Sequence, residues 1–150
     1  MLFRSHLDKF IGDGVMALFG VDQPVAEAAR QALTAAKLMA KRLDELNETL
    51  ATELAEPLRI GIGLHVGPAI IGEMGYGKAT SLTAVGDSVN TASRLEAMTK
   101  EYAAQLVVSE AVAQNAGIDL SAFESHDIGV RGRSEHITAR VIVKAQELPL

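Results

Sequence analysis

Residues 8–19 constrain the fold of this chain more than any other stretch of the sequence. They form an apolar run that is interrupted once, by Gly-Asp-Gly at residues 12–14. Two short apolar segments around a glycine-rich break are typical of a β-hairpin, and the flanking glycines leave the carboxylate open to a ligand. The sequence therefore predicts strands over residues 7–12 and 14–20, joined by a tight turn that presents Asp13.

A long helix is expected next. Asp22 supplies a capping carboxylate, and Pro24 suits the first turn of a helix. From Ala29 to Leu50, apolar residues recur at alternating spacings of three and four positions, which predicts one apolar helix face. The same spacing fits the heptad of a coiled coil, but the alanines on the seam and the strand pattern that follows favour a helix packed on a sheet.

In residues 58–66, apolar side chains alternate with arginine, glycine and histidine residues, which include Gly61 and Gly63. Period two predicts a strand with one buried face, and glycines on the other face predict the close approach of another element. A second short strand is expected at residues 69–72, followed by a glycine-rich loop over residues 73–81.

The remaining elements complete an α+β pattern. A helix is expected from Asp87 or Ser88, either of which can cap it, to about Met98. The other expected elements are a strand at 105–108, a short helix between a Ser109 cap and Gly117, and strands at 123–130 and 137–143 around a turn at 131–134. Helices that interleave with hairpin strands indicate one α+β domain with a mixed, largely antiparallel sheet.

Three polar side chains are candidates for phosphate chemistry. Asn90 and Arg94 lie one turn apart on the second long helix, with about 6 Å between their Cβ atoms. An amide can orient a ribose, and a guanidinium can stabilise charge that grows on a phosphorus. The carboxylate of Asp13 offers oxygen to a hard cation such as Mg²⁺. On residue types alone, an ordinary turn residue is the favoured interpretation of Asp13, and an exposed polar helix face explains Asn90 and Arg94 as well as a site does.

Residues 8–19 and 85–96, taken with Thr83, resemble the class III nucleotidyl cyclase catalytic domain, specifically its adenylate cyclase branch. The resemblance implies a ferredoxin-like fold and conversion of ATP into 3′,5′-cyclic AMP and pyrophosphate, in cyclic nucleotide signalling. It implies that Asn90 and Arg94 are catalytic, and that Asp13 is one of two aspartates that bind Mg²⁺ or Mn²⁺.

The resemblance also implies a head-to-tail homodimer in which Asp13 of one subunit faces the base- and phosphate-contacting residues of the other. Lys9 and Thr83 would read the purine. An ammonium donor suits adenine N1, which is an acceptor, whereas guanine presents an N–H donor at that edge. Adenylate cyclases carry aspartate or threonine at the position of Thr83, to accept a hydrogen bond from the adenine amino group. Arg133, or alternatively Arg131, stands where the family often has a lysine that binds the triphosphate.

The resemblance extends from Asp8 to about Val143 and does not include the family's first strand, which carries the other metal aspartate, or the two helices after it. Residues 1–150 are therefore expected to be a partial cyclase domain that lacks its N-terminal part. Little cyclic AMP formation is expected from this chain alone, because a two-metal site needs paired carboxylates. The alternative is a non-catalytic nucleotide-binding or dimerisation module derived from such a domain.

Composition argues against several other functions. A net charge of −5 without a basic stripe argues against a nucleic-acid partner, and the absence of cysteine excludes disulfides and cysteine–zinc sites. No apolar run approaches the ~18 residues that span a bilayer, so a cytoplasmic segment without membrane contact is expected, although a parent protein can be anchored through other parts. The glycine spacing near residue 61 does not fit a dinucleotide-binding turn, and no Walker lysine motif occurs. The histidines lack metal-ligand spacing, and His65 is expected to be a packed or hydrogen-bonded strand residue.

Overall fold

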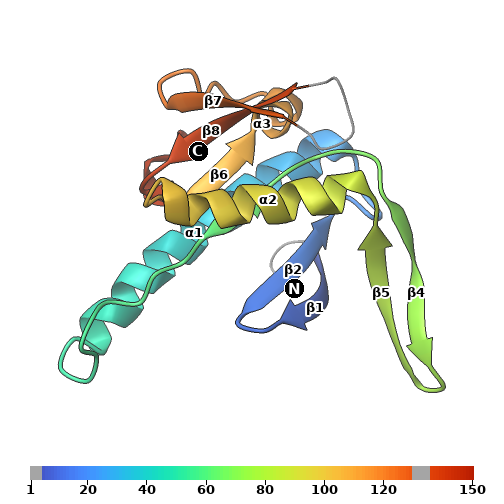
Figure 1. The fold of residues 1–150 in the computed structure, drawn as a ribbon, viewed down its shortest axis with the longest axis horizontal. Helices are drawn as coiled ribbons and strands as arrows, with labels where there is room; N and C mark the ends of the chain where they lie inside the picture. The colour runs from blue at the N-terminus through green and yellow to red at the C-terminus, as the bar shows by residue number, and fades with distance from the viewer. Residues whose placement is uncertain (1–4, 130–135) are drawn as a thin grey trace.

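The computed structural model describes residues 5–129 and 136–150, with the backbone alone described at residues 8–11 and 79. Figure 1 shows the arrangement of the helices and strands. The elements are β1 (Ser5–Ile11), β2 (Gly14–Phe19), α1 (Val25–Thr49), β3 (Ile62–Leu64), β4 (Ile70–Tyr76), β5 (Ala79–Val85), α2 (Asp87–Glu101), β6 (Leu106–Ser109), α3 (Glu110–Ala116), β7 (Glu124–Gly129), β8 (His136–Ile142) and the 3₁₀ turn η1 (Ala145–Glu147).

Within the described ranges, the strands form one four-stranded sheet and two separate hairpins. The sheet has the order β3-β6-β8-β7, in which β3 runs parallel to β6 and the other neighbours are antiparallel. The hairpins are β1–β2 and β4–β5. The architecture is α+β with mixed, largely antiparallel pairing, which confirms the predicted fold class.

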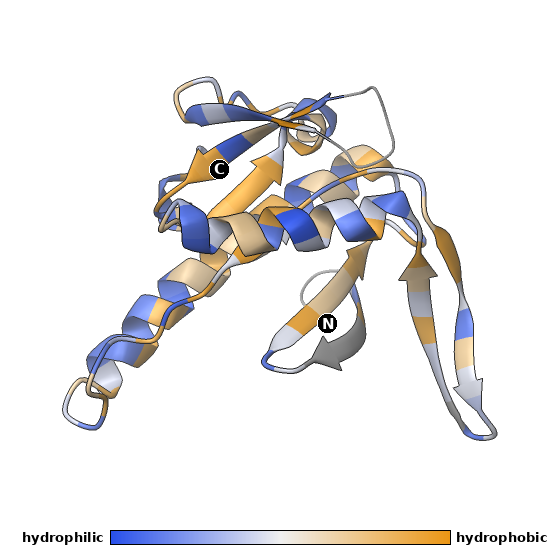
Figure 2. Ribbon diagram, in the orientation of Figure 1, coloured by the Kyte–Doolittle hydropathy of each residue, from blue (hydrophilic) through white to orange (hydrophobic). Residues whose placement is uncertain are grey.

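Strand β6 lies at the apolar centre of the fold. All its residues are buried, and Figure 2 shows it as a continuous apolar strand. Leu106 and Val108 pack against residues of α1 and α3, whereas Val107 packs against Leu95 of α2 on the opposite face. Since successive side chains of a strand point to opposite faces, α1 and α3 cover one face of the sheet and α2 covers the other.

Helix α1 confirms the predicted helix packed on a sheet. Its buried residues lie between Ala28 and Ala40, and Figure 1 shows its second half extending beyond the sheet. The residue before the first turn is Pro24, and no side chain caps the helix, so the predicted cap at Asp22 is wrong. The φ of Pro24 is −58°, which already suits helix entry, so the chain turns into the helix without a side-chain acceptor.

The glycines before and within β3 allow α2 to lie directly on the strand, as their spacing predicts. A Cβ on Gly61 would collide with the hydroxyl of Thr99, and a Cβ on Gly63 would collide with the backbone of Ala92 and Glu96. These contacts bring α2 to the sheet at backbone distance. This close packing fixes the distance between the sheet and α2, the helix that carries Asn90 and Arg94.

Two predicted segments have different lengths in the structure. Strand β3 covers only Ile62–Leu64 of the expected residues 58–66, because these are the residues that pair with β6. Residues 73–81, predicted as a loop, belong to the β4–β5 hairpin that turns at Gly77 and Lys78. Every residue of β4 is exposed, so this strand is held by backbone pairing with β5 and lacks the alternating burial pattern by which a strand is recognised in sequence.

The start of α2 also differs from the prediction. The N-cap is Gly86, with no side-chain cap hydrogen bond, so neither Asp87 nor Ser88 caps the helix as expected. Instead, the hydroxyl of Ser88 donates a hydrogen bond of 2.7 Å to the carbonyl oxygen of Pro68. This bond ties the first turn of α2 to the segment that leads from β3 into the β4–β5 hairpin.

Candidate functional site

The β1–β2 hairpin presents Asp13 at its turn, as predicted. Gly12 has a φ of 61°, a left-handed conformation that glycine adopts without strain, and Asp13 is exposed beside it. Figure 1 shows the open end of the hairpin near α2 and the turn directed away from that helix. The carboxylate is therefore accessible to a ligand or to another chain.

The positions predicted to read the base lie on strands that contact each other. Lys9 pairs with Met16 along the hairpin backbone, and a register irregularity lies between Leu7 and Lys9. Strand β1 contacts β5, which carries Thr83 opposite Gly72 of β4. Thr83 is buried, with 7% of its surface exposed. The side chain of Lys9 lies outside the described atoms.

The predicted catalytic pair lies on the outward face of α2. The backbone of Ala92 and Glu96 lies against β3, so Asn90 and Arg94, which differ from them by about half a helical turn, lie on the side of α2 away from β3 and are exposed. The α2 helix begins directly after β5 and contacts it. The structure thus brings together the strand of Lys9, Thr83 and the helix of Asn90 and Arg94.

Arg94 has a partner that the sequence does not reveal. Its Nη1 atom donates a hydrogen bond to the carbonyl oxygen of Gly129, the last residue of β7. No sequence pattern signals this bond, because it joins two elements through the backbone of a residue far along the chain. Arg131 and Arg133, the candidates for triphosphate binding, lie outside the described residues.

Asp13 is a candidate ligand for a cation, and no companion ligands stand beside it among the described residues. An exposed aspartate between glycines suits a hard cation that prefers oxygen ligands. However, the described side chains contain no group of three or more His, Cys, Asp or Glu residues that would hold a metal ion. Asp13 is therefore a candidate ligand that requires further donors from substrate phosphates or other residues.

His65 lies beneath α2 and confirms the expected hydrogen-bonded histidine. Its Nδ1 atom is 2.9 Å from the Oγ atom of Ser109, which is fully buried. Burial of the imidazole lowers the pKa of His65 below its ordinary value. Ser109 occupies the N-cap position of α3 as predicted but makes no capping hydrogen bond.

Comparison with known proteins gives consistent matches. A family model described as the adenylate and guanylate cyclase catalytic domain matches residues 8–142. An adenylate cyclase of Anabaena cylindrica is 34% identical over 145 residues, which cover 89% of this chain and 27% of that protein. Adenylate cyclase 1 of Rhizobium meliloti is 36% identical over 106 residues, which cover 69% of this chain and 16% of that protein. The chain therefore spans about a quarter or less of these relatives.

Two solved structures extend the match to the fold. The guanylyl cyclase Cya2 superposes with a TM-score of 0.76 at 25% identity, covering 92% of this chain and 69% of that chain. The adenylyl cyclase CyaB from P. aeruginosa superposes with a TM-score of 0.71 at 26% identity, covering 92% and 71%. None of the helices in the described part of the chain combines the length and apolar character that crossing a membrane requires.

Proposed function

Because the chain belongs to the adenylate and guanylate cyclase catalytic domain family, we propose that it forms the substrate site of an adenylate cyclase. In the proposed reaction, the ribose 3′-oxygen of ATP attacks the α-phosphorus. A 3′ O–P bond forms, the bond from the α-phosphorus to the bridging oxygen breaks, pyrophosphate leaves, and the hydroxyl proton passes to solvent. The observation that carries the proposal is the convergence of the Lys9 strand, Thr83 and the helix of Asn90 and Arg94.

Recognition of adenine is assigned to Lys9 and Thr83. The contact between β1 and β5, the strands that carry these two positions, supports this pairing. Thr83 is buried, so water competes weakly for a base that bonds to its hydroxyl. A base with the wrong donors and acceptors would not match these two side chains, and polar mismatches of this kind discriminate strongly between substrates.

Phosphate and ribose contacts are assigned to α2. Arg94 extends from the exposed face of the helix, where its guanidinium can stabilise charge on the pentacoordinate phosphorus. Asn90 stands one turn earlier and can orient the ribose through its amide. Both side chains depend on α2 for their direction, and α2 is held by its close packing on the glycines of β3.

Asp13 is the candidate ligand for Mg²⁺ or Mn²⁺. When bound, such a cation would neutralise phosphate charge and favour loss of the 3′-hydroxyl proton. The carboxylate at the turn has the right chemistry for this role. The remaining ligands would come from substrate phosphates or from residues other than the described ones of this chain. Arg133, or Arg131, would hold the triphosphate.

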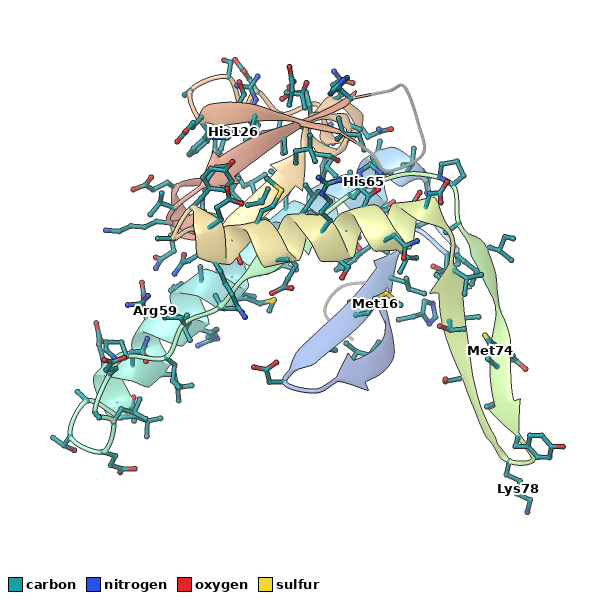
Figure 3. All side chains as sticks on the ribbon, viewed as in Figure 1. Met16, Arg59, His65, Met74, Lys78 and His126 are labelled. Carbon is teal, nitrogen blue, oxygen red and sulfur yellow. The ribbon has the colours of Figure 1, made fainter. Side chains whose placement is uncertain are left out.

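A head-to-tail homodimer is proposed as the assembly that completes the site. Asp13 of one subunit would face the residues of β1, β5 and α2 in the other. The β4–β5 hairpin supports this assembly because it projects from the body with exposed apolar side chains, among them Ile70, Met74 and Tyr76 (Figures 1 and 3). Large exposed apolar residues on one projecting element indicate an interface with a protein partner.

Base choice gives a direct test of the assignment to ATP. In a preparation of the domain that forms cyclic AMP, we expect the double change Lys9→Glu and Thr83→Cys to lower kcat/KM for ATP and raise it for GTP. The ratio of kcat/KM for GTP to kcat/KM for ATP should rise by about 10²-fold or more. The carboxylate introduced at position 9 accepts hydrogen bonds from the N–H donors of guanine, whereas adenine N1 is itself an acceptor. Steady-state assays with both nucleotides measure the ratio. Equal use of ATP and GTP by the unchanged domain would contradict the proposed specificity.

The purified 150-residue chain tests whether this segment suffices for the reaction. With ATP and Mn²⁺, we expect little cyclic AMP and weak ATP binding that the metal strengthens, because Asp13 is a single carboxylate and Mg²⁺-type sites rely on several oxygen donors. Product analysis by mass spectrometry and calorimetric titration with ATP measure the two properties. Fast turnover would show that another carboxylate completes the site, whereas ATP binding that is absent both with and without metal would favour a dimerisation module.

A further inference from the structure

The row of residues that faces α2 from β3 and its flanks contains one long side chain. Ile62, Leu64 and Val66 pack against the core on the α1 side. The intervening positions face α2, and three of them are glycines: 61, 63 and 67. The fourth is His65. The imidazole is therefore the one side chain larger than hydrogen that this row, residues 61–67, places under the helix.

The position of His65 along α2 follows from the glycines on either side. The neighbour of Gly63 is the backbone of Ala92, and the neighbour of Gly67 is the hydroxyl of Ser88. His65 lies between these two glycines, so its ring lies beneath residues 88–92 of α2. Figure 3 shows His65 beside the half of α2 that begins at Asp87.

The imidazole of His65 is hydrogen-bonded to a buried side chain, that of Ser109. Leu64 pairs with Val108 in the parallel β3–β6 ladder, so His65 and Ser109 are the next neighbours along the two strands. The 2.9 Å bond between His65 Nδ1 and Ser109 Oγ fixes the ring orientation, since Ser109 is fully buried and cannot rotate into water. Burial also lowers the pKa of His65, which favours the neutral form of the ring.

We propose that His65, held by Ser109, is a positioning residue that supports the first two turns of α2 and so sets where Asn90 and Arg94 point. The catalytic consequence rests on the proposed function. Without the ring, the close contacts at Gly63 and Gly67 remain, but the space between them under residues 88–92 is left unfilled. The hydrogen bond from Ser88 to Pro68 also holds the first turn of α2, but it lies on the far side of Gly67 from the ring and does not fill this space.

The test compares two histidines from other segments, His65 and His126, that lie near opposite ends of α2. His65→Ala removes the support beneath residues 88–92. His126→Ala is the matched control, because His126 stacks on Tyr102 at the far end of α2 with 4.5 Å between ring centroids. His65→Asn is the rescue variant, since its amide atoms occupy about the position of Nδ1 and can bond to Ser109.

Amide hydrogen exchange, resolved by residue, provides a readout that needs no nucleotide. We expect His65→Ala to raise exchange about tenfold in residues 88–94 and leave residues 97–101 unchanged, with the reverse pattern for His126→Ala and near-native exchange for His65→Asn. In a preparation that forms cyclic AMP, His65→Ala should lower kcat about 10- to 100-fold with a small change in KM, because misplaced catalytic groups slow the chemical step.

Two results would overturn the proposal: a uniform rise in exchange along the whole helix, or no local rise at all. A local rise in exchange with unchanged kcat would refute the link to catalysis. If His65→Ala loosens the first turns but even the unchanged domain forms no cyclic nucleotide in any preparation, the support role stands and the proposed function fails.

Discussion

Replacing Gly63 with alanine is expected to destabilise the domain by about 3 kcal/mol, the range of severe overpacking in a core. A Cβ at this position would lie 2.9 Å from the Cα atom of Glu96 and closer still to the carbonyl oxygen of Ala92. These atoms belong to the backbone of α2 and cannot rotate away, so the helix itself must move from the strand. The midpoint of urea unfolding, compared with that of the unchanged chain, measures the loss.

Gly72→Ala is the matched control for this change. Gly72 also lies in a strand, but nothing is within 4 Å of the Cβ that alanine would add. We expect its effect on the free energy of unfolding to stay within about 0.5 kcal/mol. Similar stability losses for the two variants would show that the close approach of α2 to β3 does not hold in solution.

The contrast between Gly63 and Gly72 illustrates what sequence can predict of this fold. Alternation of apolar residues with glycine before residue 67 predicted a strand with an element close against it, because steric exclusion acts through spacing alone. The β4–β5 hairpin was missed over residues 73–81, since every residue of β4 is exposed and its pairing leaves no periodic burial to detect.

Helix capping shows a similar limit. The sequence supplied good capping residues at Asp22, Ser88 and Ser109, yet none of them makes a side-chain cap bond. The two serine hydroxyls have other partners, Pro68 and His65, which lie in the segment between β3 and β4. Local propensity identified where each helix begins to within a few residues, but tertiary contacts decided what the side chains do.

The candidate site likewise has features that sequence spacing predicts and features that only tertiary contacts determine. Motif spacing correctly predicted that Asn90 and Arg94 share one face of a helix and that Asp13 stands at a hairpin turn. Spacing alone did not show that β1 contacts β5, or that Arg94 bonds to the carbonyl of Gly129. Those contacts join residues far apart in sequence, so only the folded chain reveals them. The roles of all these residues in catalysis stay predictions.

If each site is shared between two subunits as proposed, changing a site residue from either subunit should cause a large loss of activity. In a preparation that forms cyclic AMP, Arg94→Ala should lower kcat about 10²- to 10³-fold, because the positive charge opposite the reacting phosphorus is removed. Asp13→Ala should cause a comparable loss through the cation. Both side chains are exposed, and Arg94→Ala removes only one exposed hydrogen bond, to the carbonyl of Gly129, so each change should lower the free energy of unfolding by about 1 kcal/mol at most. A variant that unfolds early would have to be excluded from the comparison.

Mixing the two inactive variants should restore activity, because one of the two sites in each heterodimer then receives an intact Asp13 from one chain and an intact Arg94 from the other. Random pairing makes half the dimers mixed, so about a quarter of the unchanged activity is expected. The matched control mixes Arg94→Ala with Asn90→Ala, which lie in the same half of the site, so every site keeps a defect and no recovery is expected. Cyclic AMP formation is measured after exchange of subunits, with heterodimers verified by native mass spectrometry. Heterodimers that stay inactive in the first mixture would show that one chain must supply the whole site, and the head-to-tail assembly would have to be abandoned.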